Sequence, residues 1–158
     1  MLRFFKMQGC GNDYIFIDCR GQSVPHPHLL ARRVSDRHFG VGSDGLVLLL
    51  PAEGADLAMR IFNADGSEAE MCGNAIRCVG KYLYDNGIVP RADLTIEAGG
   101  QVHQLHLYTR FGTVGLVTVD MGKPAFEPSN VPVTLPGERV IDRPVTIAGG
   151  EYRITCLS

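Results

Sequence analysis

One segment of this 158-residue sequence, residues 73–86, constrains the fold more than any other. Ile76, Val79 and Leu83 recur there at helical spacing. Asn86-Gly87 then supplies a C-terminal stop for a helix. Ala75, Cys78 and Tyr82 extend the apolar surface, so this helix is apolar around much of its circumference. We therefore expect a sheet to wrap around it.

Most of the remaining chain is predicted to form short strands separated by turns of glycine and proline. The expected strands are residues 2–7, 13–19, 46–50, 57–63, 94–98, 102–108, 113–120, 139–147 and 152–157. A second helix is expected at residues 29–38, and Gly40-Val41-Gly42 follows it as a stop. Because many strands and two helices occur without regular alternation, the pattern favours an α+β fold over a doubly wound one.

Composition and charge exclude several classes of protein. The chain carries 15 basic and 17 acidic side chains without a block of like charge, so a nucleic-acid or membrane-surface partner has no support. No apolar run approaches the roughly 18 residues of a membrane span. The N-terminus turns polar too soon for a signal peptide. A cytoplasmic protein is therefore expected.

The five cysteines form neither a disulfide framework nor a metal site by their spacing. They are an odd set scattered along the chain, and no Cys-x-x-Cys pair occurs. His26 and His28 lie close together but lack a second ligand pair at zinc-like spacing. We therefore expect free thiols in a reducing compartment, each of them either core filler or reactive.

Cys72 is the cysteine whose position suits chemistry best. It lies at the start of the predicted central helix, where unpaired N–H groups and the helix dipole stabilise an anion. Helix N-termini are also where cysteine pKa values are lowered. Gly73 lacks a side chain, so a substrate carboxylate can reach the N–H groups of Gly73 and Asn74. One helical turn can thus hold an α-carboxylate and present a thiol to the adjacent carbon, as transfer of an α-proton requires.

Simpler interpretations stand beside this one. A lone cysteine in an apolar helix is more often a small buried hydrophobe, which also suits Cys78 inside the helix. Cys19 and Cys156 end apolar strands and are expected in the core. Cys10 repeats the Cys-Gly-Asn tripeptide, but a strand is expected after it, so Cys10 lacks the helix dipole.

Two asparagines are open to the same double interpretation. Asn12 and Asn63 each adjoin a turn and a glycine, where asparagine commonly caps its own backbone. Their amides are also suitable hydrogen-bond partners for a polar ligand. The residue type alone does not decide between these roles.

Four blocks of the sequence, taken together, resemble one family. They are residues 5–14, residues 36–46, residues 60–68 leading into 71–78, and residues 121–126. The family is diaminopimelate epimerase, a cofactor-independent enzyme of lysine and peptidoglycan synthesis. Because the blocks run in order along nearly the whole chain, the resemblance is far more specific than any one motif.

The resemblance implies a mechanism and a fold. Cys72 matches one of two catalytic cysteines, the one usually described as the proton donor. Gly73 and Asn74 match the cradle for the reacting end of the substrate, while Asn12 and Asn63 match substrate-binding asparagines. The family interconverts L,L- and meso-diaminopimelate without pyridoxal phosphate, as one cysteine takes the α-proton and another returns one to the opposite face. Each family domain is a mixed, largely antiparallel sheet curled around a central helix, and the full-length enzyme is expected to be a homodimer.

Two departures from the family pattern matter. Some members carry a substrate-contacting glutamine at the position of Gly45, and a glycine cannot make that side-chain contact. The second catalytic cysteine of the family lies in a C-terminal half that is missing here, since Ser158 falls just before the family's Gly-Asn-Pro-His block. Residues 1–158 are therefore expected to form an N-terminal epimerase domain, with one cysteine and part of the substrate site, that is inactive alone.

Three other functions remain open. A relative of the same architecture, such as a proline racemase or a phenazine-type isomerase, is disfavoured by the Asn-Ala-Asp-Gly-Ser-Glu run before Met-Cys-Gly-Asn. A non-catalytic folding domain would keep the motif while the thiol takes part in no reaction. The reactivity of the thiol separates this alternative from the epimerase, in which Cys72 should alkylate well below the pH at which ordinary cysteines do. A redox or metal-binding thiol protein predicts paired cysteines at short spacing, which the sequence lacks.

Overall fold

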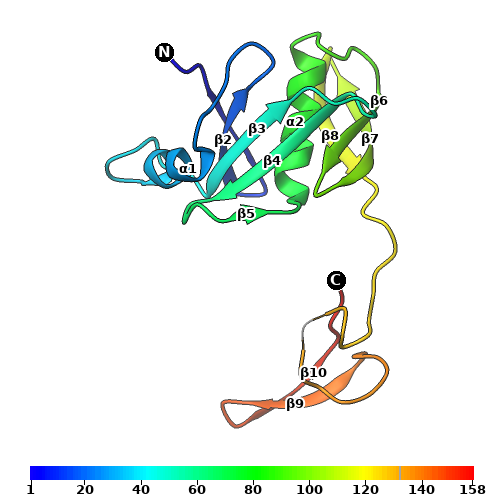
Figure 1. Ribbon diagram of the computed structural model, residues 1–158. Coiled ribbons are helices and arrows are strands. Elements are labelled where there is room, and N and C mark those ends of the chain that lie inside the picture. Colours follow the sequence, from blue (N-terminus) through cyan, green and yellow to red (C-terminus); the bar gives the residue numbers. More distant parts are fainter. Residues whose placement is uncertain (132) are drawn as a thin grey trace. The chain divides into compact units, whose positions relative to one another are not determined.

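The computed structural model describes residues 1–131 and 133–158 of the chain (Figure 1). The chain divides into two compact units, Met1–Asp120 and Met121–Ser158. All of the predicted site residues, from Asn12 to Asn74, belong to the first unit. The fold of that unit therefore decides how the candidate site is built.

The first unit is a mixed sheet with two helices. Its elements in chain order are β1 (Phe5–Gly9), β2 (Asn12–Asp18), α1 (Pro27–Ser35), β3 (Gly45–Leu50), β4 (Leu57–Asn63), β5 (Glu68–Ala69), α2 (Gly73–Asp85), β6 (Asp93–Ala98), β7 (Gln101–Arg110) and β8 (Thr113–Val119). The strands are ordered β1-β2-β3-β4-β6-β7-β8, and the short β5 pairs with β4. The pairings are antiparallel except for β2–β3 and β4–β6. The predicted α+β class, with a mixed and largely antiparallel sheet, is confirmed.

Each of the two parallel pairings is connected through a helix. Helix α1 lies between β2 and β3 in the chain, and α2 lies between β4 and β6. A crossover of this kind is needed because two parallel strands cannot be joined by a tight turn. The expected lack of strand–helix alternation is therefore wrong at these two places.

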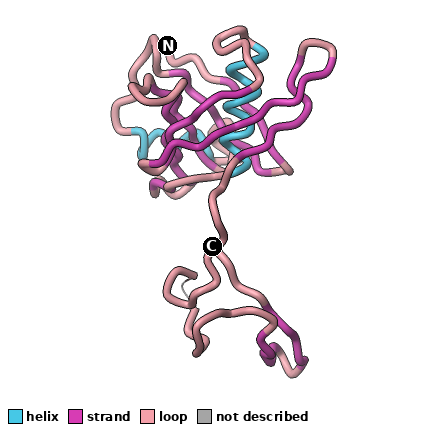
Figure 2. The backbone as a smooth tube through the Cα atoms, turned by 90° about the vertical axis from the view of Figure 1, so that its right-hand side faces the viewer, coloured by secondary structure: helices cyan, strands magenta, loops and turns pink. Residues whose placement is uncertain are grey.

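Helix α2 is surrounded by the sheet, as its apolar sequence predicts. Its fully buried residues include Ala75, Ile76, Val79 and Leu83. The helix contacts β1, β2, β7 and β8, and two perpendicular views show strands on more than one side of it (Figures 1 and 2). Gly80 permits a close approach of β7, because a Cβ there would lie 3.0 Å from Leu105 Cδ2 and 3.1 Å from Leu107 Cδ2. Full burial contributes about 1.5–3 kcal/mol for each leucine or isoleucine, so Ile76 and Leu83 each stabilise the unit by about that amount.

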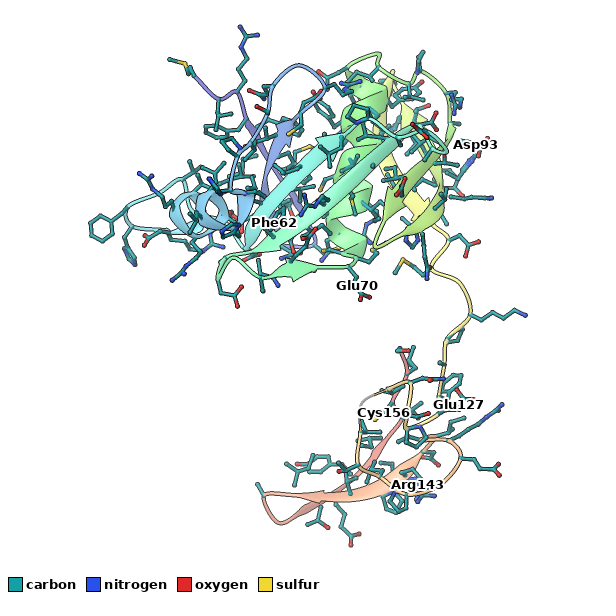
Figure 3. All side chains as sticks on the ribbon, in the orientation of Figure 1. Phe62, Glu70, Asp93, Glu127, Arg143 and Cys156 are labelled. Atoms are coloured by element: carbon teal, nitrogen blue, oxygen red, sulfur yellow. The ribbon has the colours of Figure 1, made fainter. Side chains whose placement is uncertain are left out.

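Strands β2 and β3 are buried on both faces. One set of side chains, including Phe16 and Val47, belongs to the cluster that contains α2. The other set, including Ile15 and Leu46, packs with α1 and with Phe62 of β4, which is labelled in Figure 3. This double burial explains why both strands are continuous apolar runs rather than alternating ones.

Four hairpins are closed by two-residue turns in which both residues have positive φ. The turns are Cys10-Gly11, Gly99-Gly100, Phe111-Gly112 and Ala148-Gly149. This is the type I′ geometry, whose twist matches the twist of the flanking strands. Each of these turns has a glycine at its second position, and glycine adopts positive φ without a steric penalty.

Several boundaries differ from the prediction. Strand β1 begins at Phe5 rather than at residue 2, and α1 ends at Ser35 rather than at residue 38. The helix ends there because the Asp36 carboxylate accepts hydrogen bonds from the backbone N–H groups of His38 at 2.7 Å and Phe39 at 2.8 Å. Strand β5 is absent from the prediction, because a strand of two residues carries no periodic signal.

In the described residues of the second unit the regular structure is one hairpin, β9 (Arg143–Ile147) and β10 (Gly150–Ile154). Val140 is fully buried there, and Ala125 and Ser158 exchange two backbone hydrogen bonds of 3.1 Å. Strand β9 is shorter than the predicted 139–147, because Asp142 turns the chain with a φ of 51°. Across the described part of both units, no helix combines the length and apolarity that a bilayer crossing requires.

Candidate functional site

The predicted site residues lie where three strands and one helix begin or end. Strand β2 starts at Asn12 and the parallel β3 starts at Gly45, while β4 ends at Asn63. Tyr14, Gly45 and Asn63 are therefore neighbours across the three strands. Cys72 immediately precedes α2. Segments that are distant in the sequence thus converge at one end of the sheet.

Cys72 is the N-cap residue of α2. Its backbone is extended, with φ −142° and ψ 112°, and the Ile76 N–H donates to the Cys72 carbonyl at 3.0 Å. The N–H groups of Gly73, Asn74 and Ala75 precede that bond and so have no acceptor within the helix. The Cys72 side chain makes no capping hydrogen bond to these N–H groups. The helix N-terminus therefore offers donors and a positive dipole end to an anion beside the Cys72 sulfur.

Two polar side chains contact the Cys72 sulfur. The thiol donates to Asn12 Oδ1 at 3.5 Å, and the Tyr14 hydroxyl donates to the sulfur at 3.5 Å. Asn12 and Tyr14 are two residues apart on β2, so they point to the same face of the sheet. Burial, and then the hydrogen bond with Cys72, raises the pKa of Tyr14 well above its usual range. The sulfur therefore has beside it one acceptor, Asn12 Oδ1, and one donor, the Tyr14 hydroxyl, which is protonated at neutral pH.

A directed chain of hydrogen bonds fixes the two asparagines near Cys72. Arg77 donates to Asn74 Oδ1 at 2.5 Å, and the Asn74 amide nitrogen donates to Asn12 Oδ1 at 3.4 Å. The Asn12 amide nitrogen donates to Asp44 Oδ2 at 2.7 Å. A guanidinium can only donate and a carboxylate can only accept, so both amides are held in one orientation. Asn12 Oδ1 is consequently held toward the sulfur.

Asp44 belongs to a cluster of charged side chains at the same end of the sheet. Asp13 pairs with Lys6 at 2.9 Å and with Arg37 at 2.7 Å, and Arg37 also pairs with Asp44 at 2.9 Å. The hydrogen bonds from Arg37 and then from Lys6 hold the pKa of Asp13 far below its usual range. The Asp13 side chain is 17% exposed, whereas those of Lys6 and Arg37 are 38% and 55% exposed. Water therefore screens these pairs in part.

Cys10 lies near α2 but in a different setting from Cys72. It is exposed, and it occupies the first position of the turn before β2 with a φ of 53°. Arg77 Nη2 donates to its sulfur at 3.5 Å. As predicted, a strand rather than a helix follows it, so Cys10 is not the N-cap residue of a helix as Cys72 is.

Gly73 and Gly45 differ in what surrounds them. A Cβ at Gly73 would meet Arg77 Nη1 at 3.7 Å, an ordinary contact, so the fold leaves this position open. A Cβ at Gly45 would lie 2.3 Å from the Phe62 carbonyl oxygen and 3.0 Å from Tyr14 Cε1. No side chain fits at Gly45, which acts as a spacer beside the Tyr14 ring. Its predicted contact with a substrate can therefore come only from the backbone.

Asn63 lies in a turn with its own hydrogen bond, and the three remaining cysteines are wholly or partly buried. The Asn63 side chain donates to Ser67 Oγ at 2.9 Å within the turn before β5, as turn asparagines often do. Cys78 is 6% exposed, and burial raises the pKa of its thiol. Burial likewise raises the pKa of Cys19, while Cys156 is half-buried in the second unit. The structure thus joins Asn12 directly to Cys72 and Asn74 to Cys72 through Asn12. Asn63 is linked to the site by the strand register, which places it beside Gly45.

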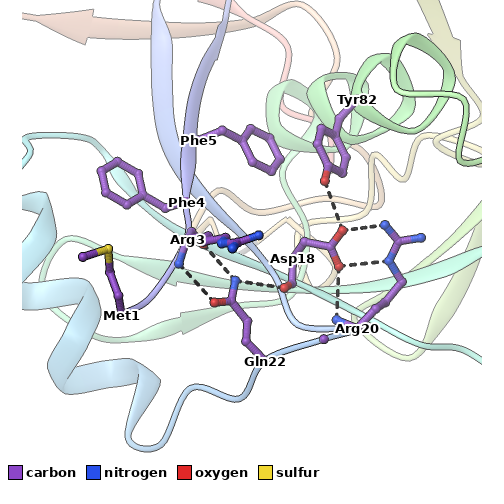
Figure 4. Close-up of a pocket in the computed structure, with 9 residues that line it drawn as sticks. Met1, Arg3, Phe4, Phe5, Asp18, Arg20, Gln22 and Tyr82 are labelled. Atoms are coloured by element: carbon purple, nitrogen blue, oxygen red, sulfur yellow. Dashed lines mark hydrogen bonds and ion pairs between the residues drawn. The ribbon is translucent and has the colours of Figure 1, made fainter.

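An open pocket of about 840 Å³ lies elsewhere on the first unit. It is lined by Met1, Arg3, Phe4, Phe5, Asp18, Arg20, Gly21, Gln22 and Tyr82 (Figure 4). Tyr82 donates to Asp18 at 3.0 Å, and Arg20 pairs with the same carboxylate, so this network fastens α2 to β2. The pocket contains no predicted site residue. In the described part of the chain, no cluster of three or more His, Cys, Asp or Glu side chains could hold a metal ion.

Solved structures show in which other proteins this fold occurs. A hydroxyproline epimerase from Agrobacterium vitis is similar with a TM-score of 0.67 at 18% identity, over 99% of this chain and 48% of that one. A probable proline racemase from Agrobacterium radiobacter K84 gives a TM-score of 0.65 at 19% identity, over 99% and 49% of the two chains. The fold is therefore the one found in these epimerases and racemases.

Sequence comparison identifies the family within this class. The family model for diaminopimelate epimerase matches residues 4–127. Curated diaminopimelate epimerases from Acetivibrio thermocellus and Desulfovibrio desulfuricans are 51% and 50% identical to this chain over 99% of its length. The chain belongs to the diaminopimelate epimerase family. It spans about half the length of these relatives, 56% and 57% respectively.

The sequence motifs do not predict three residues that the structure places in the candidate site. Tyr14, Asp44 and Arg77 each contact a predicted residue directly. The alternation of side chains along β2 places Tyr14 on the face of Asn12, so a signal for Tyr14 was present. The contacts of Asp44 and Arg77 depend on tertiary packing, which local patterns do not show.

Proposed function

We propose that this chain supplies one half of a diaminopimelate epimerase site, with Cys72 as one of its two proton-transferring groups. The observation that carries the proposal is the position of the Cys72 sulfur at the N-terminus of α2. The free N–H groups beside it suit the α-carboxylate of an amino acid. Membership of the family supports the reaction, interconversion of L,L- and meso-diaminopimelate.

The substrate α-carboxylate binds the N–H groups of Gly73 and Asn74 in this proposal. Arg77 adds positive charge nearby, since its Nη1 lies 3.7 Å from where a Gly73 Cβ would be. When the α-proton leaves, negative charge spreads onto the carboxylate, and these donors stabilise it. Asn12 and Asn63 bind other polar groups of the substrate.

Cys72 then acts as the proton donor to one face of the α-carbon. Its S–H bond breaks, the proton forms the new C–H bond, and the electron pair stays on sulfur. The base that takes the original proton is a second cysteine, which we assign to the part of the relatives that this chain does not span. In this proposal one cysteine thiolate removes the α-proton and the Cys72 thiol delivers another, and these two steps need no pyridoxal phosphate.

Hydrogen exchange in D2O tests the proposal. The 158-residue chain is incubated with L,L- and meso-diaminopimelate, alone and fused to the unmatched portion of the Acetivibrio thermocellus relative. We expect inversion with α-deuteration by the fusion, none by the chain alone, and none by the fusion with Cys72→Ala. Inversion that survives Cys72→Ala, or inversion by the chain alone, would overturn the assignment of a half-site.

The proposal extends to domain organisation, assembly and location. We assign residues 1–158 to an N-terminal epimerase domain, the full-length protein to a homodimer, and its location to the cytoplasm. The free state of Cys10, Cys19, Cys72, Cys78 and Cys156 is compatible with that reducing compartment. Sedimentation of the fusion protein tests the dimer, which a monomer at micromolar concentration would contradict.

A further inference from the structure

The proposed mechanism leaves one contact of the site unused, the hydrogen bond from the Tyr14 hydroxyl to the Cys72 sulfur. When Cys72 gives up its proton, the sulfur becomes an anion that is partly removed from water and needs donors. We propose that Tyr14 is a further catalytic residue, whose hydroxyl is the side-chain donor that stabilises the Cys72 sulfur after the proton has left. This inference rests on the proposed function, because it assigns a role within the same site.

Asn12, the other side chain that contacts the sulfur, cannot donate a hydrogen bond to the deprotonated sulfur. Its amide nitrogen is bound to Asp44 Oδ2 at 2.7 Å, so its oxygen faces the sulfur. A carbonyl oxygen accepts the thiol proton but cannot donate to an anion. Turning the amide round would break the bond to Asp44 and the bond from Asn74. Asn12 therefore favours the protonated sulfur, and Tyr14 is left as the donor to the deprotonated one.

Tyr14 is held in place for this role before any reaction occurs. Its side chain is 6% exposed and belongs to the core cluster around α2, with its ring edge-on to Phe16 at 6.4 Å between centroids. Gly45 has no Cβ to obstruct the ring, whose Cε1 lies 3.0 Å from that position. A donor fixed by packing needs no reorganisation when charge develops. A Cβ at Gly45 would meet both this ring and, at 2.3 Å, the Phe62 carbonyl oxygen, which explains why this position carries no side chain.

The proton balance of the step is simple. The S–H bond of Cys72 breaks, the proton bonds to the substrate α-carbon, and both electrons of the S–H bond remain on sulfur. The O–H bond of Tyr14 stays intact and only donates, because burial keeps the pKa of Tyr14 well above neutrality. No oxidant or further reactant is required.

Tyr14→Phe tests the inference because it removes the hydroxyl and keeps the ring in the core. The measurement is the rate of alkylation of Cys72 by iodoacetamide in the 158-residue chain at pH 7.5, followed by mass spectrometry of its peptide. Cys10, which is exposed, is the internal reference in the same sample. Tyr82→Phe is the matched control, because Tyr82 also loses a hydrogen-bonded hydroxyl, the one that donates to Asp18.

The expected change in the Cys72 alkylation rate of Tyr14→Phe is the result of two opposing effects. Loss of a hydrogen bond to a charged group lowers the thiolate fraction by about tenfold. The remaining thiolate is less stabilised and reacts about threefold faster, since nucleophilicity rises with basicity at a slope of about 0.4–0.5. We therefore expect Cys72 to alkylate about threefold more slowly in Tyr14→Phe. The Cys10 rate in that variant, and the Cys72 rate in Tyr82→Phe, should stay within about 30% of wild type.

A Cys72 rate equal to that of wild type in a folded Tyr14→Phe chain overturns the inference. A second measurement avoids altering the core: the Cζ carbon of Tyr14, labelled with 13C, should shift in Cys72→Ala while that of Tyr82 should not. An unchanged Tyr14 resonance also overturns the inference. Neither experiment contains substrate, so failure here leaves the deuterium-exchange test of the epimerase function intact.

Discussion

Replacing Asp13 with asparagine tests whether the charged cluster stabilises the first unit through its charges. The Asp13 carboxylate accepts bonds of 2.7 and 3.2 Å from Arg37 and lies 2.9 Å from Lys6. The cations remain 55% and 38% exposed, so each pair belongs near the top of the roughly 0.2–1 kcal/mol range of exposed pairs. We expect Asp13→Asn to lower the free energy of unfolding at neutral pH by about 1–2 kcal/mol.

The loss of unfolding free energy in Asp13→Asn should depend on pH. Arg37 and Lys6 hold the folded-state pKa of Asp13 below its ordinary value of 3.8. A group with a depressed folded pKa contributes stability that is complete above its unfolded pKa and is lost as the pH falls toward the folded pKa. The difference between wild type and Asp13→Asn should therefore be complete from about pH 5 to 7 and shrink below about pH 4.

Urea denaturation followed by far-UV circular dichroism at pH 7 and pH 3 measures this difference. Asp93→Asn is the matched control, because the Asp93 side chain is 82% exposed and its loss should change the free energy of unfolding by less than about 0.5 kcal/mol. Salt near 1 M, where the Debye length is about 3 Å, should also reduce the Asp13 effect. An equal loss at both pH values would mean that asparagine disturbs the packing, and the charge argument would be refuted.

Three further substitutions test the helix, the turn and the anion site. Gly73→Ala should preserve or raise the free energy of unfolding, because a Cβ there meets only an ordinary contact and alanine favours helix by up to about 1 kcal/mol. In the fusion protein it should weaken diaminopimelate binding by about tenfold in calorimetry, because the methyl group blocks the N–H donors. Leu83→Ala should cost about 2–5 kcal/mol in urea unfolding, since Leu83 is 0% exposed. Cys10→Gly should gain about 0.5 kcal/mol in the same assay, because glycine relieves the positive φ of Cys10; a loss would show that the contact with Arg77 matters more.

The fold elements that the sequence predicts well are those with strong local signals. Helix α2 is apolar on most sides, and such a helix has to be buried, so both its bounds and its covering by strands were predictable. Strand β4 coincides with the predicted 57–63. The two parallel pairings were not predictable, because strand order depends on how the helices cross the sheet and not on any local pattern.

The candidate site also has features that the sequence predicts and features that depend on tertiary packing. The position of Cys72 at a helix N-terminus follows from the sequence, since a glycine and a periodic apolar run come directly after it. Its contact with Tyr14 joins residues separated by 58 positions, and it exists only because β2 packs against α2. The role of Gly45 as a spacer depends on the Phe62 carbonyl and the Tyr14 ring, so it too appears only in the folded chain.

The two-residue turn at Cys10-Gly11 limits the insertions that the chain can tolerate between β1 and β2. Asn12 begins β2 directly after that turn and pairs with Gly9. One inserted residue would open the turn or slip β1 against β2, and a slip of one residue sends every side chain of a strand to the opposite face. If β2 is the strand that slips, Asn12 and Tyr14 would point toward the side of α1, away from the Cys72 sulfur. Surface loops usually tolerate insertions, but the length of this turn sets the pairing register of β1 with β2, the strand that carries Asn12 and Tyr14.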